Sequence, residues 1–236
     1  MPPDTPPDPS QPRILALGDS AFTVALPDAP GPATTARLAA AVAALRAAGG
    51  VVDAAAAFRT LTVHLDPLAA DRPALEALAL RAVQGPPAAL EGAAWRIPVC
   101  FDPDFGPDQQ EVAAEAGLTV ADVIELMAQA ELTVLMVGFL PGFPFCGPAP
   151  APLALPRKKT PRLRVPPGSL AVAMGFAGIY PWESPGGWRI LGRCPLRLFD
   201  PTHDRPALFA AGDSLRVAPV SRAEHDRAAR ADPRGF

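Results

Sequence analysis

The sequence has 236 residues, of which 49% are hydrophobic and 19% are charged, and its formal net charge is −3. A chain of this length and apolar content can bury a core as one large domain or as two small ones. The charge balance gives no electrostatic reason to expect a nucleic acid or an anionic membrane as a partner.

The N-terminal residues and the cysteines indicate the compartment. Residues 1–12, MPPDTPPDPSQP, contain no basic residue and no apolar stretch, which predicts a disordered Pro-rich tail and excludes a signal peptide. The sequence has three cysteines, Cys100, Cys146 and Cys194, an odd number without a CxxC pair. Such a pattern is typical of proteins in a reducing cytosol. We therefore expect a cytoplasmic protein, and we expect the cysteines to fill small apolar sites.

Residues 13–90 are predicted to form a small α+β domain. The stretches 21–26 and 59–67 place apolar residues at every second position, which is a strand pattern with one buried face. The stretches 32–50 and 72–83 instead place leucines and alanines on one helical stripe. This strand–helix–strand–helix order favours one α+β layer.

Residues 91–220 are predicted to form a second, mainly β domain. Alternate residues from Trp95 to Phe101 are apolar, and the later runs SLAVAMG, GWRIL, LRLF and SLRVAPV are short and separated by Pro and Gly. Short strands with turn residues every ten or so positions are typical of a β-barrel or a sandwich.

Two short helices are expected within this second domain. Pro107 suits a first helical position, Gly117 suits a helix stop, and Thr119 with Asp122 resembles a capping box. Residues 221–236 are expected to form a C-terminal tail.

Several kinds of site are not indicated by the sequence. His64, His203 and His225 show no metal-ligand spacing, and no Cys/His cluster is present, so we expect no metal site. The sequence contains no GxSxG, no GxxxxGK[ST] and no GxGxxG after a strand. A self-contained Walker-type ATPase, a Rossmann enzyme and an α/β-hydrolase are therefore unexpected.

A basic stretch, LPRKKTPRLRVPPGS, is the first candidate binding feature. Arg162 and Arg164 flank Leu163, and strand periodicity would place both guanidinium groups on one face. Two guanidinium groups on one face can clamp a carboxylate or a phosphate through forked hydrogen bonds. The alternative interpretation is a solvated basic loop.

The turn SPGGW is the second candidate feature. Pro185–Gly186 fits a type II turn in which Gly186 has a positive φ, and Gly187 would allow a ligand to approach closely. Consecutive N–H groups of such a turn can bind an anion. The alternative is a tight hairpin with Trp188 packed on the core. Glu183 beside it is an isolated acid that could serve as a general base or pair with an arginine such as Arg193.

Three linked motifs, GFLPGFPFCG, PRKKTPRLRVPPGSLAVA and GIYPWESPGGWRILGRCPLRLFD, resemble the allophanate hydrolase subunit 1 family. That family includes the B component of bacterial 5-oxoprolinase and a sporulation-kinase inhibitor. The resemblance runs from about residue 13 to 220. It implies a small α+β domain followed by a cyclophilin-like β-barrel.

The resemblance also implies a reaction and partners. The reaction is ATP-dependent opening of 5-oxoproline to glutamate, with an allophanate hydrolase subunit 2-type protein and a lactam-utilisation subunit as partners. Such a site must hold a carboxylate and phosphate oxygens. We therefore expect Arg162, Arg164, Arg193, Gly186 and Gly187 to bind substrate or phosphate. Glu183 and Tyr180 are the expected catalytic residues.

Two alternatives stay open at the level of sequence. A relative of this family could act on urea-derived amides as a hydrolase or carboxyltransferase component, or it could be a regulatory protein that inhibits a histidine kinase. This chain also departs from the family pattern, because Met127 and Leu132 stand where the family usually has a histidine and a tyrosine. The sequence leaves open whether that histidine takes part in chemistry or in packing.

Overall fold

The computed structural model describes residues 10–87, 89–90 and 92–231, and the chain divides into two compact units, 1–90 and 91–236. Most of the predicted N-terminal tail, residues 1–9, lies outside the described residues. Among the described residues, no helix combines the length and apolar character that crossing a bilayer requires.

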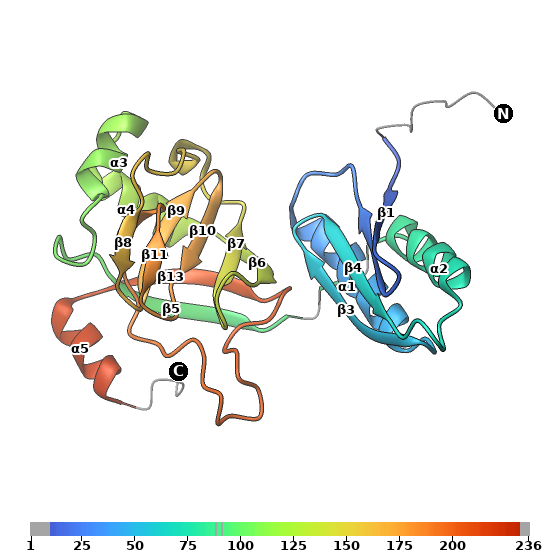
Figure 1. Cartoon of the computed structure of the whole chain (residues 1–236). Coiled ribbons are helices and arrows are strands. Elements are labelled where there is room, and N and C mark those ends of the chain that lie inside the picture. The colour runs from blue at the N-terminus through green and yellow to red at the C-terminus, as the bar shows by residue number, and fades with distance from the viewer. Residues whose placement is uncertain (1–9, 88, 91, 232–236) are drawn as a thin grey trace. The chain divides into compact units, whose positions relative to one another are not determined.

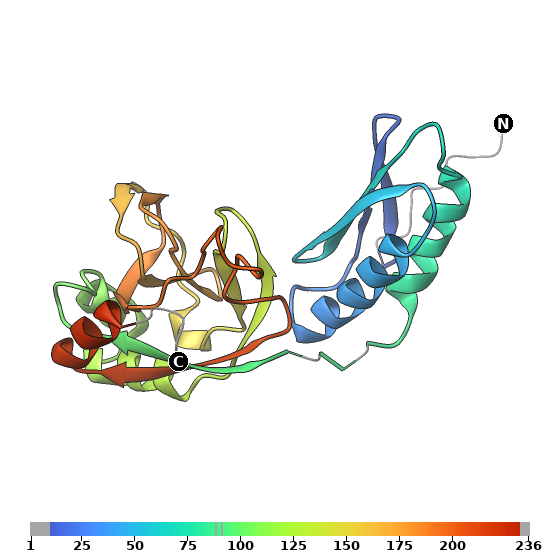
Figure 2. The same cartoon turned by 90° about the horizontal axis from the view of Figure 1, so that it is seen from below.

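Unit 1 is a four-stranded antiparallel sheet with two helices on one face (Figures 1 and 2). The strand order is β1-β2-β4-β3. The alternating residues Phe22, Val24, Leu61 and Val63 are fully buried, as the strand pattern predicts. The elements are β1 Arg13–Leu17, β2 Ala21–Ala25, α1 Pro32–Arg46, β3 Val51–Ala57, β4 Thr60–Leu65 and α2 Arg72–Gln84.

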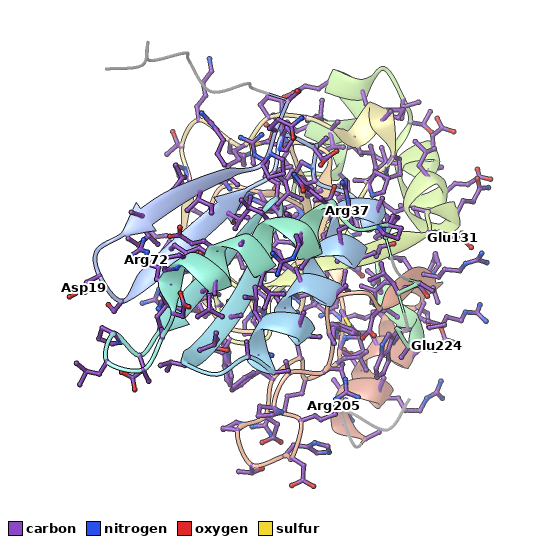
Figure 3. All side chains as sticks on the ribbon, turned by 90° about the vertical axis from the view of Figure 1, so that its right-hand side faces the viewer. Asp19, Arg37, Arg72, Glu131, Arg205 and Glu224 are labelled. Carbon is purple, nitrogen blue, oxygen red and sulfur yellow. The ribbon has the colours of Figure 1, made fainter. Side chains whose placement is uncertain are left out.

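Charged side chains on the surface of unit 1 stabilise its connections. The labelled Arg72 lies near the start of α2, where it pairs with Glu76 at 2.8 Å and donates to the Gly18 carbonyl oxygen (Figure 3). Arg37 on α1 pairs with Asp28 at 3.0 Å. These contacts are exposed or half-buried, so they fix loops more than they stabilise the fold.

Unit 2 is a closed seven-stranded barrel with the order β10-β7-β6-β13-β5-β12-β9. The pair β13–β5 is parallel, and the other barrel pairs are antiparallel. The barrel strands are β5 Ala94–Cys100, β6 Leu132–Val137, β7 Pro144–Gly147, β9 Ser169–Ala173, β10 Phe176–Ile179, β12 Arg189–Arg193 and β13 Ser214–Val220.

A two-stranded sheet and three α-helices complete unit 2 (Figure 1). The sheet pairs β8 with β11, and a bulge separates Ser184 from Gly186. The additional elements are α3 Gln109–Ala116, α4 Val120–Gln129, the 3-10 turn Ala151–Leu153, β8 Arg162–Val165, β11 Ser184–Gly186 and α5 Arg222–Arg230.

The ends of the two short helices follow from local sequence. Helix α3 begins two residues after Pro107, with Asp108 at the N-cap, and it ends at Gly117 in the left-handed conformation. Thr119 and Asp122 form the predicted capping box at the start of α4. The predicted start of this helix at Pro107 was therefore two residues too early. The predicted end at Gly117 and the predicted capping box of Thr119 and Asp122 are confirmed.

The C-terminal segment is a helix where a tail was predicted. Residues 222–230 form α5, and Ser221 with Glu224 makes a second capping box. His225 and Ala228 are buried, because α5 packs on β5. The helix was missed because its apolar positions are few, so the pattern of hydrophobic residues is weak. The labelled Glu131 and Glu224 lie on the outside of unit 2 (Figure 3).

Both departures from the family pattern lie in the hydrophobic core of unit 2, Met127 on α4 and Leu132 on β6. Met127 is fully buried and Leu132 is almost fully buried, in one cluster with Val123 and Val134. Neither residue lines the pocket described below. In this chain the position of the family histidine is therefore a packing position, which a flexible thioether fills well.

We expect the substitution Met127→Ala to lower the free energy of unfolding of unit 2 by about 2–5 kcal/mol, because it leaves a cavity in the core that α4 shares with the barrel strands. Met127→Leu conserves volume and is expected to cost less than about 1.5 kcal/mol. All three tryptophans, Trp95, Trp182 and Trp188, belong to unit 2, so urea titration followed by tryptophan fluorescence reports this unit. Equal stability of the two variants would contradict the packing role.

Candidate functional site

Three of the residues predicted to form a site, Tyr180, Gly186 and Gly187, line one pocket of about 260 Å³ in unit 2. The pocket is bounded by the loop before β7, by the basic stretch and by the chain around β11. Its other lining residues are Phe139, Phe143, Phe145, Arg157, Pro161, Pro185 and Trp188.

Aromatic rings form the walls of this pocket, and Phe143 lies at their centre. Its ring centroid is 4.8 Å from that of Phe145, 5.1 Å from Tyr180 and 5.8 Å from Trp188. The contacts with Tyr180 and Trp188 are edge-to-face, which is a favoured geometry for aromatic pairs. Phe143 also contacts Phe139, which is largely exposed and has a φ of 69°. The walls are therefore rigid and apolar.

Tyr180 brings a polar atom to this apolar pocket. Burial raises the pKa of Tyr180, although the backbone N–H of Trp188 and the charges of Arg157 and Arg162 act to lower it. The phenol therefore stays protonated at neutral pH. Trp188 N–H donates to the hydroxyl oxygen, which leaves the hydroxyl hydrogen as a donor.

The two glycines differ from the predicted type II turn. Residues 184–186 form strand β11, and neither Gly186 nor Gly187 has a positive φ. The alternation of right- and left-handed residues that an anion nest needs is therefore absent at this pair. Gly186 is instead required by packing, because a Cβ there would lie 2.4 Å from the Tyr180 hydroxyl oxygen. At Gly187 a Cβ would meet nothing closer than 3.6 Å.

The basic stretch is tied to helix α3 through Asp108, which is 2% exposed. One carboxylate oxygen of Asp108 accepts from Lys158 Nζ at 3.0 Å and from Arg162 Nη2 at 2.7 Å. The other accepts from the Ile190 backbone N–H at 2.7 Å. Three segments of unit 2 therefore meet at one buried carboxylate.

The contacts of Asp108 decide its ionisation. Burial acts to raise the pKa of Asp108, but hydrogen bonds from Arg162, Ile190 and Lys158 outweigh burial, and its pKa is held below 3.8. Asp108 is thus a carboxylate at neutral pH. At the N-cap of α3 its carbonyl oxygen accepts from the Val112 N–H at 2.9 Å, but its side chain makes no capping hydrogen bond, because both carboxylate oxygens accept from these distant donors.

Two further acids of α3 extend the network. Glu111 pairs with Lys158 and, at 3.0 Å, with Arg189, and Glu115 pairs with Arg189 at 2.9 Å. Arg189 is almost fully buried and also donates to the Pro156 carbonyl oxygen. The backbone N–H of Lys158 donates to the Gly187 carbonyl oxygen at 2.8 Å. The segment that carries Arg157 is thus held against the chain around β11.

Arg162 and Arg164 have different surroundings. Arg162 is half-buried and bonded to Asp108, whereas the side chain of Arg164 is 81% exposed and lies 3.6 Å from Glu183. Glu183 is itself exposed and pairs with Arg164, so the arginine partner that the structure gives it is Arg164 and not the suggested Arg193. Neither Arg164 nor Glu183 lines the pocket.

Arg193 lies in another part of unit 2. Its guanidinium group stacks on Phe105 at 4.2 Å, and that of Arg222 lies 4.0 Å from the same ring. Burial and the charge of Arg222 lower the pKa of Arg193. The His225 ring also contacts Phe105, at 4.7 Å between centroids. Arg193 therefore holds loop and helix together here, and it does not line the pocket.

The remaining titratable candidates have no contact with the pocket. Cys100, Cys146 and Cys194 are buried and form no disulfide, as expected for core residues. Burial raises the pKa of Cys194 to about 12 and that of Cys146 further, so both thiols stay protonated. His64 is exposed on β4, as predicted. Within the described ranges no three His, Cys, Asp or Glu side chains form a group that could hold a metal.

Sequence reasoning missed four residues that shape the pocket: Asp108, Phe143, Phe145 and Arg157. The density of aromatic residues in GFPF was a signal for Phe143 and Phe145. Arg157 is the first cation of the basic stretch, but its position in the sequence did not show that it, and not a neighbouring cation, would line the pocket. Asp108 gave no local signal, because all of its partners lie far along the chain.

Comparisons with known proteins agree with this architecture. Residues 12–209 match the family described as carboxyltransferase domain, subdomain C and D. The chain is 42% identical over 129 residues to the B component of 5-oxoprolinase from Bacillus subtilis, an alignment that covers 55% of this chain and 54% of that protein. It is 31% identical over 204 residues to the B component of 5-oxoprolinase from Haemophilus influenzae, an alignment that covers 86% of this chain and 96% of that protein.

A solved structure shows the same fold at lower sequence identity. The urea amidolyase of K. lactis matches 100% of this chain with 16% of its own length, at a TM-score of 0.75 and 17% identity.

The match over residues 12–209 places the closed barrel and the unit before it in a carboxyltransferase-type domain. The chain belongs to the carboxyltransferase domain family, subdomain C and D. The family resemblance seen in the three linked motifs is thereby confirmed, with relatives that are named as B components of 5-oxoprolinase. The alignments to two of these relatives, from Bacillus subtilis and Escherichia coli, span about half of their length.

We expect Asp108→Ala to lower the free energy of unfolding of unit 2 by about 3 kcal/mol, since it leaves two cations and a buried N–H without their shared acceptor. Tryptophan fluorescence in urea measures this change. Asp104→Ala is the control, because the Asp104 side chain is 86% exposed and its loss is expected to cost at most about 0.5 kcal/mol.

The pH dependence gives an independent check on Asp108. Its native pKa is lower than its unfolded pKa, so the stabilisation is complete above the unfolded value and is lost as the pH falls through the native value, below 3.8. The stability difference between the wild type and Asp108→Asn should therefore shrink over this acid range. A difference that is constant with pH would exclude the charge as its origin.

The two glycines form a matched pair for a second test. Gly186→Ala must displace the buried Tyr180 ring, and we expect it to cost roughly 1–3 kcal/mol. Gly187→Ala meets only ordinary van der Waals contacts and is expected to stay within about 0.5 kcal/mol of the wild type. Urea unfolding measures both variants. If Gly187→Ala proved the more damaging, the packing explanation would be wrong.

Proposed function

We propose that this chain is the B component of an ATP-dependent 5-oxoprolinase, which opens 5-oxoproline to L-glutamate. The observation that carries the proposal is the aromatic pocket with Arg157 and the Tyr180 hydroxyl, in a chain whose relatives carry the name of that same component. The pocket offers apolar walls for a ring and polar groups for a carboxylate and a carbonyl oxygen.

The chemistry explains why more than one protein is needed. A lactam carbonyl is a poor electrophile, and transfer of a phosphoryl group from ATP to its oxygen makes attack by water and ring opening feasible. The sequence has no phosphate-binding loop of the GxxxxGK[ST] type. ATP is then a substrate of the assembled complex, and we propose that a partner helps to bind it.

The partners follow from the same proposal. We propose an allophanate hydrolase subunit 2-type protein and a lactam-utilisation subunit, with the assembly located in the cytoplasm. Exposed apolar side chains near the pocket would be available for such contacts: Phe139 is 64% exposed, Leu163 is 86% exposed and Trp182 is 39% exposed. A contiguous exposed apolar patch, if these side chains form one, is a feature of surfaces that bind another protein.

The same exposed side chains are what the regulatory alternative would use. A protein that inhibits a histidine kinase needs an apolar docking surface, and it needs no pocket that selects a small anion. Regulation and hydrolysis therefore predict different results when the chain is omitted from a reconstituted enzyme.

The test is co-expression of this chain with candidate subunit 2 and lactam-utilisation proteins, followed by measurement of ATP hydrolysis that depends on 5-oxoproline. We expect activity from the three-component complex and loss of that activity when this chain is omitted. Activity that is undiminished without this chain would reject the proposal and favour regulation. An assembled complex that is inactive on 5-oxoproline should be tested with urea-derived amides.

A further inference from the structure

The geometry points to the aromatic pocket as a binding site for a small ring carboxylate that this chain forms without its partners, with Arg157 as the carboxylate-binding residue. In this assignment the rings hold the lactam, and the Tyr180 hydroxyl donates to its carbonyl oxygen. The inference rests on the proposed function for the choice of 5-oxoproline. Its geometric basis is independent of the reaction.

The size of the pocket selects a small ligand. Its volume of about 260 Å³ lies below the range of about 300–1,000 Å³ that is usual for drug-sized ligands. Five aromatic rings line it, and the central ring, Phe143, contacts the other four. A single five-membered ring suits these flat apolar walls, and a nucleotide does not.

The distribution of charge selects Arg157 among the cations of the basic stretch. Lys158 and Arg162 are bonded to Asp108, and Arg164 lies against Glu183. Arg157 lines the pocket, and it makes no ion pair with any acid in the described part of the chain. A guanidinium group without an internal acid can pair with a ligand carboxylate through two parallel hydrogen bonds.

The position of Arg157 is fixed by its neighbour. The Lys158 N–H bonds to the Gly187 carbonyl oxygen, and the Lys158 side chain reaches Asp108 and Glu111. The backbone next to Arg157 is therefore held at the edge of the pocket, which lowers the entropy that binding costs.

Tyr180 supplies the second polar contact. Its oxygen accepts from the Trp188 N–H, and burial keeps the phenol protonated, so its hydrogen can be donated to a ligand carbonyl oxygen. Tyr180 lines the pocket beside Gly186, where a Cβ would lie 2.4 Å from the hydroxyl oxygen. A ring that has both a carboxylate and a carbonyl group satisfies Arg157 and Tyr180 together.

The test is isothermal titration of the full isolated chain with three ligands. L-5-oxoproline has both groups, 2-pyrrolidone lacks the carboxylate, and cyclopentanecarboxylate lacks the lactam. We expect saturable binding of 5-oxoproline, and weaker binding of 2-pyrrolidone by on the order of tenfold or more, the usual effect of losing a charged hydrogen bond. Absence of saturable 5-oxoproline binding would overturn the inference, whatever the reconstituted enzyme does.

Two variants separate Arg157 from general electrostatic attraction. Arg157→Gln should weaken 5-oxoproline binding by on the order of tenfold or more and leave 2-pyrrolidone binding unchanged. Lys159→Gln removes one charge from the same stretch outside the pocket lining, and binding should stay as in the wild type. Equal losses in the two variants would overturn the assignment of Arg157.

A third variant tests the hydroxyl donor. Tyr180→Phe should weaken 5-oxoproline and 2-pyrrolidone by a similar factor and leave cyclopentanecarboxylate unchanged, because only the first two carry a carbonyl oxygen in the ring. Unfolding in urea, followed by tryptophan fluorescence, checks that the variant is folded. A folded Tyr180→Phe variant that binds all three ligands as the wild type does would exclude the hydroxyl contact.

Discussion

The buried carboxylate of Asp108 is the constraint on which the arrangement of unit 2 around the pocket depends. It accepts from Lys158, Arg162 and the Ile190 N–H, which belong to the basic stretch, β8 and β12. A buried charge is costly unless it is paired and hydrogen-bonded, so each of these donors must stay in place. The basic stretch is thereby fixed on α3, and Arg157 is fixed at the edge of the pocket.

Much of the fold could be predicted because its signals are local. Alternation of apolar residues, the stop at Gly117 and the capping box of Thr119 depend on residues a few positions apart. The Asp108 network could not be predicted in this way. Its partners lie 50, 54 and 82 positions away in the sequence. One of them is a backbone N–H, which every residue except proline has, so no residue type signals it.

The double glycine shows that the physical reason predicted for a residue can be wrong even where the residue lines the pocket. Gly186 and Gly187 do line the pocket, but a positive φ does not explain either of them. A glycine can be required because its backbone has a positive φ, or because a packed side chain leaves no room for a Cβ. The sequence does not distinguish these two causes. At Gly186 the neighbour is Tyr180, which lies in the connection between β10 and β11, and only the three-dimensional structure shows that its ring packs against Gly186.

The cations of the basic stretch divide into two groups, those that pair with acids of this chain and those that do not. A guanidinium or ammonium group that is saturated by internal acids gives rigidity, and its charge is no longer available to a ligand. Lys158 belongs to this first group, because it pairs with both Asp108 and Glu111. Arg162 is held by Asp108 through Nη2, while its buried Nη1 has no hydrogen-bond partner among the described residues. To bind a ligand, Arg157 needs a fixed backbone and a side chain that forms no ion pair within the described part of the chain. Lys158, the next residue, supplies that condition, because its side chain bonds to Asp108 and its backbone N–H bonds to the Gly187 carbonyl oxygen.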